Sequence, residues 1–335
     1  MRPRKRKVRE LSGFSGFRAR FPYPAGVSDS RPTVIQTEHL SPGAAAWLAD
    51  RAHLVVGAPG SDAFEAAAPA ATGLVVRTYT KVDDALLARL PSLRAVGRAG
   101  VGLDNVDVDA CARRGVRVFN TPDANTQAVV EYVTCLVCDA LRPRVFLEAP
   151  VDRARWDELR QEVVAHRQMS ELRLGILGLG RIGKRVAQVA RAIGFDVAYH
   201  DLAEVPHDLR HGAKPFGLEE LFATSDVVTV HVDGRESNRG FVGAWLIERM
   251  KADAVFLNTS RGFVVDHAAL ARALRSNPGM LAILDVHEPE PIDATNPLLG
   301  LSNAHLAPHL ASRTDAAMEA MSWVVRDVWD AIRPR

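Results

Sequence analysis

Cysteine is scarce in this chain, and long apolar runs are missing. The 335 residues include only Cys111, Cys135 and Cys138, too few for a disulfide scaffold and typical of a reducing compartment. No apolar run reaches the ~18 residues that a membrane-spanning helix needs. We therefore expect a cytoplasmic protein without a membrane partner.

Two of the cysteines form the sequence CLVC, residues 135–138. This spacing resembles a redox pair or half of a zinc site. No second pair exists, and the flanking residues have the pattern of a helix interior. We interpret both cysteines as small buried residues and expect no metal.

Charge is nearly balanced overall, at +2, but residues 1–20 hold eight Lys or Arg and one Glu, a local charge of +7. This stretch lacks the apolar core of a secretory signal. It is weakly similar to a transit peptide, and a disordered basic arm or an early translation start explains it equally well. We expect residues 1–32 to be a disordered basic tail, and we infer no nucleic-acid partner from it.

Short apolar runs alternate with helical patterns through the remaining chain, which predicts βαβ units and parallel sheets. Five runs precede residue 122, namely TVIQT, HLVVGA, GLVVRT, LRAVGRAG and VRVFNT. Six follow residue 172, namely RLGILGLG, FDVAYHD, DVVTVHV, AVFLNTS, LAILDV and NAHLAPH. We predict an α/β protein with two Rossmann-like domains, the second built on a six-stranded dinucleotide-binding sheet.

Two longer helical patterns flank this second series. TQAVVEYVTCLVCDALR begins at Thr126, and the polar segment 143–171 after it has only a loose helical pattern. RTDAAMEAMSWVVRDVWDAIR, near the C-terminus, reads as one amphipathic helix. Its apolar side consists of Ala317, Met321, Val324, Val328 and Ile332.

The segment from Leu174 to Asp201 contains G-x-G-x-x-G as Gly178, Gly180 and Gly183. The motif follows a strand and opens a helix, which makes it specific. The first glycine permits a tight turn, the second leaves room for a pyrophosphate, and the third allows close helix packing. The helix N-terminus offers free N–H groups to phosphates. A dinucleotide cofactor is predicted.

Asp201 ends the next strand, 18 residues after the third glycine. A carboxylate there accepts hydrogen bonds from ribose hydroxyls and repels a 2′-phosphate. No Arg follows at 202–204 to reverse that preference. We therefore expect NAD rather than NADP; a glycine-rich turn of an unrelated α/β fold is the alternative.

Charged side chains follow three of the later strands: Arg261, then Glu288 and Glu290 in a proline-bounded loop, then His309. Parallel strands end on the same side of a sheet, so these groups are expected to converge. The fork of an Arg suits a two-oxygen acceptor. A carboxylate beside an imidazole raises its pKa, which suits proton donation to a keto group. Taken singly, each group reads as a surface charge.

With these motifs the sequence resembles the D-isomer-specific 2-hydroxyacid dehydrogenases, and most of all their phosphoglycerate dehydrogenase branch. The resemblance spans residues 33–333 and is carried by VVRTYTKV, GRAGVGLDNVD, NTPDANT, LGILGLGRIG, NTSRGFVVD, LDVHEPEP and PHLAS. It implies catalytic roles for Arg261, Glu290 and His309, rather than for Glu288 and His305. Formate dehydrogenases of the same fold are less similar, because they carry Gln in place of Glu290.

The resemblance also implies contacts for the cofactor and the substrate. Cofactor contacts fall on Arg181, Ile182, Asp201, Thr259, Ser260 and Asp285. A substrate carboxylate is expected at the backbone N–H groups of Ala99, Gly100, Val101 and Gly102. Arg77 and Lys81 occupy the segment that holds the substrate phosphate in phosphoglycerate dehydrogenases, although both also read as surface charges.

The family's architecture implies a flavodoxin-like substrate domain formed by residues 33–124 and 311–335, and an NAD-binding domain formed by residues 125–310. The helix from Thr126 helps form a dimer in relatives, so a homodimer is expected. Relatives usually read HVPL where this chain reads HVDG (231–234), which leaves cofactor-side packing at Asp233 open. We expect no serine feedback, because no regulatory domain follows the last helix.

We therefore predict an NAD-dependent D-2-hydroxyacid dehydrogenase that catalyses reversible hydride transfer, with phosphoglycerate dehydrogenase-like specificity. Glyoxylate or hydroxypyruvate reduction is the alternative. An alternative from a different functional class is a non-enzymatic, NAD-sensing corepressor similar to the C-terminal binding proteins. The basic tail would suit such a role. Those proteins retain the same three charged groups, so the sequence alone does not separate the two classes.

Overall fold

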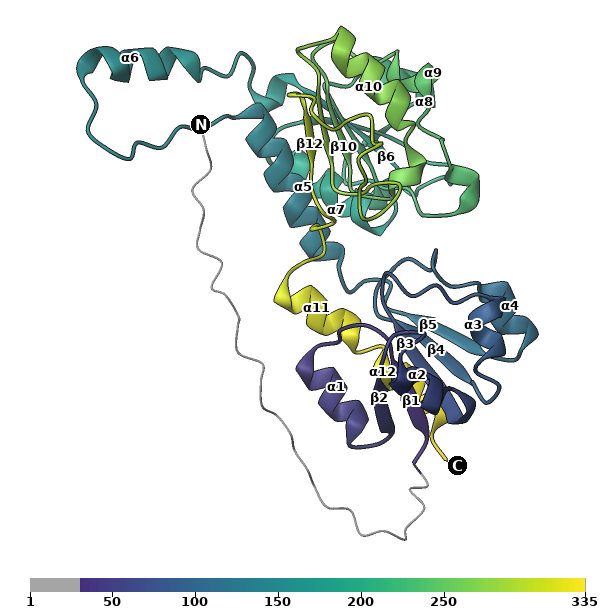
Figure 1. Cartoon of the computed structure of the whole chain (residues 1–335). Helices are drawn as coiled ribbons and strands as arrows, with labels where there is room; N and C mark the ends of the chain where they lie inside the picture. Colours follow the sequence, from purple (N-terminus) through teal and green to yellow (C-terminus); the bar gives the residue numbers. More distant parts are fainter. Residues whose placement is uncertain (1–30, 335) are drawn as a thin grey trace. The chain divides into compact units, whose positions relative to one another are not determined.

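A computed structural model of the chain describes residues 31–334 (Figure 1). The predicted basic tail, residues 1–32, therefore lies almost wholly outside the described residues. Among residues 31–334 no helix is long and apolar enough to cross a bilayer. Two all-parallel sheets organise this part of the chain, which confirms the predicted fold class.

The first sheet has five strands in the order β2-β1-β3-β4-β5, the flavodoxin-like order. Its strands are β1 (Thr33–Gln36), β2 (His53–Val56), β3 (Ala71–Val76), β4 (Ala95–Arg98) and β5 (Arg117–Asn120). The connecting helices are α1 (Pro42–Ala49), α2 (Asp62–Ala67), α3 (Asp84–Ala88) and α4 (Val108–Arg113). Each helix begins after a Ser or Asp whose side chain accepts an N–H of the first turn, which fixes its start.

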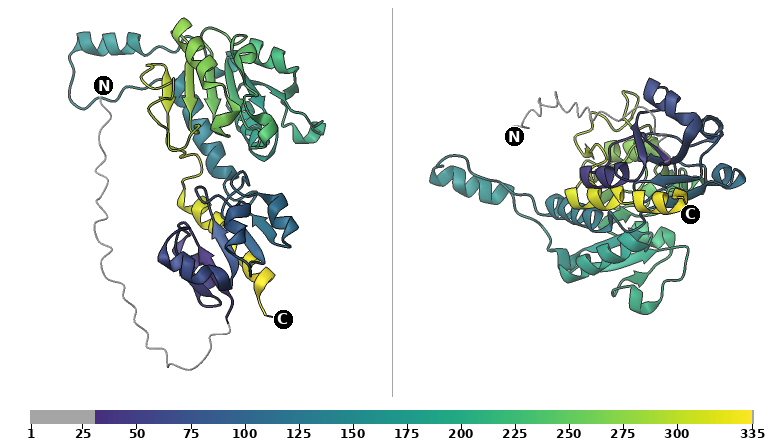
Figure 2. Two further views of the ribbon diagram at one scale, coloured as in Figure 1. Left: turned by 45° about the vertical axis from the view of Figure 1, so that its right-hand side comes forward. Right: turned by 90° about the horizontal axis from the view of Figure 1, so that it is seen from below.

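Of the two C-terminal helices, α11 (Asp315–Ser322) and α12 (Val325–Ile332), α12 packs on β3, β4 and β5 of this first sheet, and both helices contact α1 (Figure 2). Gly97 allows the close approach, since a Cβ there would lie 2.5 Å from Val328. The five apolar side chains predicted to share one side are all buried, as expected. The prediction of one continuous helix was wrong, because the chain breaks at Trp323 and Val324.

The second sheet has seven strands in the order β12-β11-β10-β9-β6-β7-β8. They are β6 (Arg173–Leu177), β7 (Asp196–His200), β8 (Lys214–Pro215), β9 (Val227–Val230), β10 (Val255–Asn258), β11 (Leu281–Leu284) and β12 (Ala304–Leu306). The six predicted strands are present. The seventh, β8, was missed because two residues, one of them proline, leave no strand pattern in the sequence.

The remaining helices connect or flank the second sheet. They are α5 (Thr126–Leu141), α6 (Arg153–Glu162), α7 (Arg181–Ala192), α8 (Leu218–Thr224), α9 (Ala244–Ile247) and α10 (His267–Ser276). Single 3-10 turns occur at η1 (Ala68–Ala70), η2 (Met169–Glu171), η3 (His207–Leu209), η4 (Glu236–Asn238) and η5 (Gly262–Val264). Helices α5 and α7 pack against each other, and both contribute to one apolar core with β6 and β7.

The interpretation of the CLVC cysteines as buried was wrong. Helix α5 buries a valine stripe that includes Val133 and Val137. Cys135 and Cys138 lie off that stripe, so the first is exposed and the second is half-buried. Among the described residues, no group of three or more His, Cys, Asp or Glu side chains is arranged to hold a metal ion.

Candidate active site

The charged groups predicted at strand ends lie at one edge of the second sheet. Arg261 follows β10, Glu290 follows β11 and His309 follows β12, and these three strands are neighbours. His309 Nδ1 lies 2.9 Å from Glu290 Oε2. The structure therefore brings together the imidazole and the carboxylate that the sequence analysis paired.

His309 is held in an uncommon backbone conformation. Its φ is +54°, in the left-handed region that costs a non-glycine residue energy. Its N–H donates to the carbonyl oxygen of Asp285 at 2.8 Å. Pro308, which cannot donate to a strand partner, lies between the end of β12 and this turn. The turn directs the ring to Glu290, whereas His305 is exposed within the strand.

Glu290 is an anionic partner for that ring. Burial acts to raise the pKa of its carboxyl. The hydrogen bond and charge of His309, together with a hydrogen bond from the His287 N–H, outweigh burial and bring the pKa below its usual value. The ionised carboxylate therefore accepts the Nδ1 proton of His309. The other ring nitrogen, Nε2, has no protein partner among residues 31–334.

Arg261 is fixed by two oxygen acceptors. Its Nε and Nη2 donate to Asp104 Oδ1 at 3.0 and 2.8 Å, and its Nη1 donates to the Ser260 carbonyl at 2.7 Å. Burial acts to raise the pKa of Asp104, but the charge and hydrogen bond of Arg261 lower it on balance. Sequence reasoning missed Asp104, although it stands inside the quoted segment GRAGVGLDNVD.

Arg98, at the end of β4, was also missed. Its desolvation, with the nearby charge of Arg261, lowers the pKa of this guanidinium to about 10. Its Nε is buried and has no hydrogen-bond partner in the described structure. A cation desolvated beside a second cation is costly unless an anion joins them. The sequence signal was available, since an Arg at the carboxyl end of a parallel strand marks a ligand crevice.

The predicted substrate loop, residues 99–102, lies against Arg261. A Cβ on Gly102 would lie 1.9 Å from Arg261 Nη2, so a side chain there would displace the Arg261 guanidinium. Within the loop, the N–H of Ala99 donates to Val76 and that of Gly100 donates to Arg98. In the described residues, the N–H groups of Val101 and Gly102 donate to no protein acceptor. These two are the ones left for a carboxylate.

Arg77 and Lys81 have different surroundings. Arg77 donates to the His39 carbonyl at 3.3 Å, and its charge acts on Arg98. Lys81 is 79% exposed and lies 3.7 Å from Asp83. It lines a hollow with Tyr79 and other residues, and no predicted catalytic residue lines that hollow. Only Arg77 therefore shares the electrostatic environment of Arg98 and Arg261.

The glycines of G-x-G-x-x-G have the geometry that a pyrophosphate site needs. Gly178 has φ +93°, and a Cβ on it would meet the His231 backbone at 2.9 Å. Gly183 would meet the Gly178 carbonyl at 2.2 Å, so the helix packs tightly on the loop. Gly180 faces open space at the N-terminus of α7. Space and free N–H groups thus coincide where phosphates bind.

Other predicted cofactor contacts surround this loop or follow β10. Asp201 accepts the N–H of Leu179 at 2.7 Å, so its carboxylate lies beside the loop. Thr259 Oγ1 is buried without a hydrogen-bond partner, and a bound ligand is one way to satisfy such an atom. The residues present therefore fit a dinucleotide. Elsewhere, Arg181 pairs with Asp123 at 2.8 Å, Ile182 packs on the core and Ser260 donates to Asn258.

Asp285 holds the backbone of the turn at His309. Its two carboxylate oxygens accept the N–H groups of Leu310 and Ala311 at 2.7 and 2.8 Å. Burial raises the pKa of Asp285, in spite of these donors, the nearby His309 and the hydroxyl of Tyr132. Burial, with the charge of Asp285, also raises the pKa of Tyr132 to about 12. Asp285 thus anchors the backbone that follows His309.

The departure at Asp233 is accommodated within its own loop. Its carboxylate accepts from Arg235 Nε at 2.7 Å, and its backbone and side chain accept from Asn238 at 3.0 Å. The following residue, Gly234, approaches Arg261, because a Cβ there would lie 3.2 Å from Arg261 Cγ. Asp233 is therefore neutralised locally.

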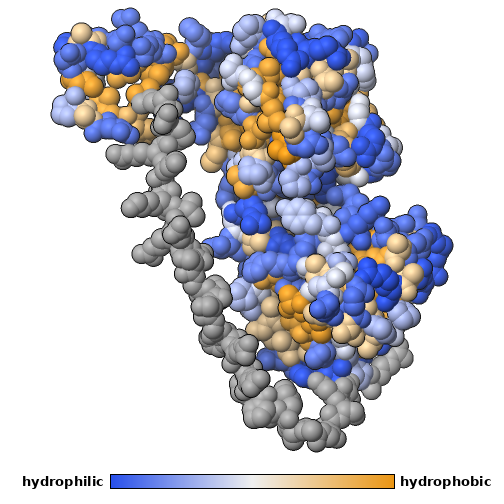
Figure 3. Space-filling view, viewed as in Figure 1, coloured by the Kyte–Doolittle hydropathy of each residue, from blue (hydrophilic) through white to orange (hydrophobic). Residues whose placement is uncertain are grey.

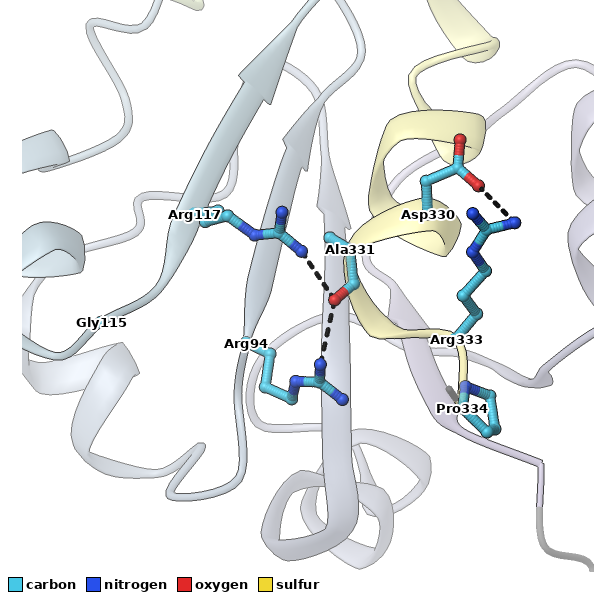
Figure 4. A pocket seen from close by; sticks show the side chains of 7 residues that line it. All are labelled: Arg94, Gly115, Arg117, Asp330, Ala331, Arg333 and Pro334. Atoms are coloured by element: carbon cyan, nitrogen blue, oxygen red, sulfur yellow. Dashed lines mark hydrogen bonds and ion pairs between the residues drawn. The ribbon is translucent and has the colours of Figure 1, made fainter.

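A separate hollow of about 740 Å³ lies at the amino ends of β4 and β5, opposite to the strand ends that carry the site's groups (Figure 4). Arg94 and Arg117 line it, and both donate to the Ala331 carbonyl, at 3.1 and 2.7 Å. Cations at a helix C-terminus satisfy its free carbonyls. The two arginines thus cap α12, and none of the predicted catalytic residues lines this hollow.

Taken together, the fold and the site define an α/β protein with a dinucleotide-binding loop and a His–Glu pair at the carboxyl edge of one sheet. Residues 134–311 match the family model described as D-isomer specific 2-hydroxyacid dehydrogenase, NAD binding domain. The chain belongs to the family of D-isomer specific 2-hydroxyacid dehydrogenases. The resemblance predicted from the sequence is confirmed.

Three relatives illustrate the range of the family. D-3-phosphoglycerate dehydrogenase of Archaeoglobus fulgidus is 34% identical to this chain, and the matched region covers 77% of this chain and 49% of the relative. Glyoxylate reductase of Aeropyrum pernix is 38% identical over 70% of this chain and 71% of the reductase. (S)-sulfolactate dehydrogenase of Chromohalobacter salexigens is 38% identical over 76% of this chain and 82% of that enzyme. The chain thus spans about half the length of the phosphoglycerate dehydrogenase.

Solved structures of the same fold include proteins with either cofactor. D-lactate dehydrogenase of Aquifex aeolicus, complexed with NAD and lactic acid, has a TM-score of 0.75 and 26% identity, covering 88% of this chain and 94% of its own. An NADPH-dependent glyoxylate/hydroxypyruvate reductase of Sinorhizobium meliloti, in complex with NADP and malonate, has a TM-score of 0.75 and 28% identity. The match covers 90% of this chain and 94% of the reductase chain.

Proposed function

We propose that this protein is a D-2-hydroxyacid dehydrogenase that interconverts a 2-hydroxy acid and its 2-keto acid with NAD. The observation that carries the proposal is the 2.9 Å contact between His309 and Glu290, beside a fixed Arg261. A proton carrier, a carboxylate that orients it and a cation for the substrate are what this reaction needs from the protein.

His309 acts as the proton carrier. Glu290 accepts the Nδ1 proton, so Nε2 is the nitrogen that exchanges a proton with the substrate oxygen. In reduction, His309 gives this proton to the carbonyl oxygen of the keto acid, and in oxidation it takes the hydroxyl proton back. A nicotinamide dinucleotide held at the glycine loop before α7 would supply or accept the hydride. The hydrogen bond to Glu290 holds the imidazole in the same orientation in both directions.

Arg261 and the loop at 99–102 hold the substrate. The free N–H groups of Val101 and Gly102, next to the Arg261 guanidinium, offer donors to the carboxylate. Asp104 fixes the guanidinium, and its Oδ1 also lies beside Gly102. This arrangement orients the 2-position of the acid, so that proton and hydride transfer become geometrically matched.

NAD is preferred to NADP. Asp201 lies beside the glycine loop at the end of β7, where its carboxylate would repel a 2′-phosphate. Relatives of this fold include an NAD complex and an NADPH-dependent reductase, so the preference belongs to individual chains. In this chain we assign it to Asp201.

The substrate carries a second anionic group, as 3-phosphoglycerate does. Arg77 and Arg98 share one electrostatic environment with Arg261, and the desolvated Arg98 lacks a partner at Nε. An anion there would compensate both charges. Lys81, which pairs with Asp83 away from this group, contributes less than predicted. A glyoxylate or hydroxypyruvate reductase is the alternative, supported by the 38% identical glyoxylate reductase.

NADH oxidation with purified protein tests these points. The panel consists of phosphohydroxypyruvate, hydroxypyruvate, glyoxylate, a sulfonated keto acid and branched 2-keto acids. We expect the highest kcat/KM with a keto acid that has a second anion. A preference for glyoxylate would favour the reductase, and no turnover with any acid would favour a cofactor-sensing, non-enzymatic role.

The architecture of the protein follows the family. Residues 33–124 and 311–335 form the substrate domain, because α12 packs on the first sheet and α11 packs on α1, and residues 125–310 form the NAD domain. A second copy of the chain covers the segment around α6, which has no buried residue. We call this segment, residues 143–171, the α6 arm, and Figure 3 shows apolar side chains along it. They are Phe146, Leu147, Val151, Trp156 and Val164.

A further inference from the structure

His287 lies between the catalytic groups without being one of them. It follows β11 and is only 6% exposed. Its backbone N–H donates to Glu290 Oε1 at 2.9 Å. Its ring Nε2 donates to the Ala307 carbonyl at 2.8 Å. Ala307 stands two residues before His309, so His287 contacts Glu290 directly and also the segment that leads to His309.

The third catalytic segment also packs on this residue. A Cβ on Gly262, the residue after Arg261, would lie 2.0 Å from the His287 carbonyl carbon and 2.5 Å from its Cα. The Arg261 turn can therefore lie flat on the His287 backbone only because residue 262 is glycine. The three turns that carry Arg261, Glu290 and His309 thus meet at one residue.

The hydrogen bonds of the His287 side chain determine which ring nitrogen carries the proton. A carbonyl oxygen can only accept, so the ring proton is on Nε2 when it contacts Ala307. Nδ1 is buried without a partner in the described part of the chain. The ring therefore makes one hydrogen bond, and that bond ties the β11 loop to the turn that holds His309. Glu290, which lies in the same loop, contacts the His309 imidazole and so provides a second link between the loop and this turn.

We propose that His287 is a positioning residue that sets the His309–Glu290 geometry by clamping the Glu290 loop to the Ala307 carbonyl. This inference rests on the proposed function only for its kinetic readout. Loosening the clamp displaces the proton carrier relative to the substrate, and displacements of about 1 Å cost up to about 100-fold in rate. Substrate and cofactor groups outside the clamp stay in place.

Three substitutions separate the ring bond from mere bulk. His287→Gln places an amide N–H near the position of Nε2, His287→Asn reaches only the position of Nδ1, and His287→Phe fills the space without a donor. His305→Gln is the matched control, because His305 is an exposed histidine of the neighbouring strand β12. Thermal unfolding of each variant shows that it is folded.

We expect kcat to fall at least about tenfold in His287→Asn and His287→Phe, with the NADH dissociation constant nearly unchanged. His287→Gln should recover most of the loss, and His305→Gln should match the wild type. Wild-type kcat in the Phe variant, or a Gln variant as slow as Phe, would overturn the proposal.

A readout that needs no turnover separates this inference from the proposed function. The Glu290 carboxyl is titrated by carbon NMR in protein with labelled glutamate, and assigned with Glu290→Gln. If His287 clamps the pair, the lowered pKa of Glu290 should rise in His287→Phe and return in His287→Gln. An unchanged titration in all variants refutes the clamp, whether or not any keto acid is turned over.

Discussion

Arg261 and Asp104 are 157 positions apart in the chain, yet Nη2 of the one lies 2.8 Å from Oδ1 of the other. The two side chains are only 24% and 29% exposed. The contact joins the turn after β10 to the loop after β4, and it holds the guanidinium beside Gly102. Under the proposed function, the pair contributes to substrate binding.

Removing the negative charge at Asp104 should weaken substrate binding more than it slows the chemical step. Asp104→Asn keeps the shape but leaves the Arg261 fork without its counterion, so we expect KM for the keto acid to rise about tenfold while kcat changes less. Arg261→Lys should act in the same direction, since a point charge lacks the fork. Asp109→Asn, an exposed carboxylate in α4, is the control, and an unaltered KM in the first two variants would contradict the assignment.

His309 is expected to govern the chemical step. His309→Asn removes the proton carrier while leaving the glycine loop intact, so kcat should fall at least about 100-fold. NADH affinity, measured by fluorescence titration, should stay close to that of the wild type. Near-normal turnover in this variant would remove His309 from the mechanism.

Glu290 should make the stability of the protein depend on pH in a defined window. Its pKa in the folded protein is below the usual 4.5, so its stabilising contribution is complete above that value and is lost as the pH falls through the lowered pKa. The Tm difference between wild type and Glu290→Gln should therefore be largest near neutrality and shrink below about pH 4.5. A Tm difference that is constant from pH 7 to pH 3 would show that the pKa of Glu290 is not lower in the folded protein than in the unfolded chain.

Much of this site could be predicted from the sequence because it depends on strand ends. A parallel strand determines where the next residue lies, so the strand pattern alone was enough to place Arg261, Glu290 and His309 on one edge of a sheet. The choice of Glu290 over Glu288 depended on resemblance, because both acids share one loop and spacing alone does not orient them.

The remainder of the site depends on tertiary contacts that leave no local pattern. Asp104 reads as a loop acid until it is found on Arg261, and His287 reads as a histidine next to a proline-rich loop. The exposure of Cys135 was missed for the same reason, since an apolar helix reveals its buried side only when its neighbours are known. The short strand β8 has too few residues to carry a period.

The cofactor preference can be tested at one side chain. Asp201→Ala removes the carboxylate beside the glycine loop and should relax the preference toward NADPH, because the repulsion of a 2′-phosphate disappears. The ratio of kcat/KM for NADH to that for NADPH is expected to fall at least about tenfold. Asp208→Ala, a carboxylate in η3, serves as the comparison, and an unchanged ratio in Asp201→Ala would mean that selectivity has another source.

The α6 arm should determine the oligomeric state. Phe146 is 75% exposed and Trp156 is 47% exposed, although neither residue type favours water. If a second copy covers them, the double substitution Phe146→Glu and Trp156→Glu should shift the protein from dimer to monomer in sedimentation velocity at micromolar concentration. Val56→Glu introduces the same charge at a 63% exposed valine of β2 and should leave the dimer intact. A wild-type monomer, or a dimer that persists in the double variant, would place these apolar side chains outside any interface between copies.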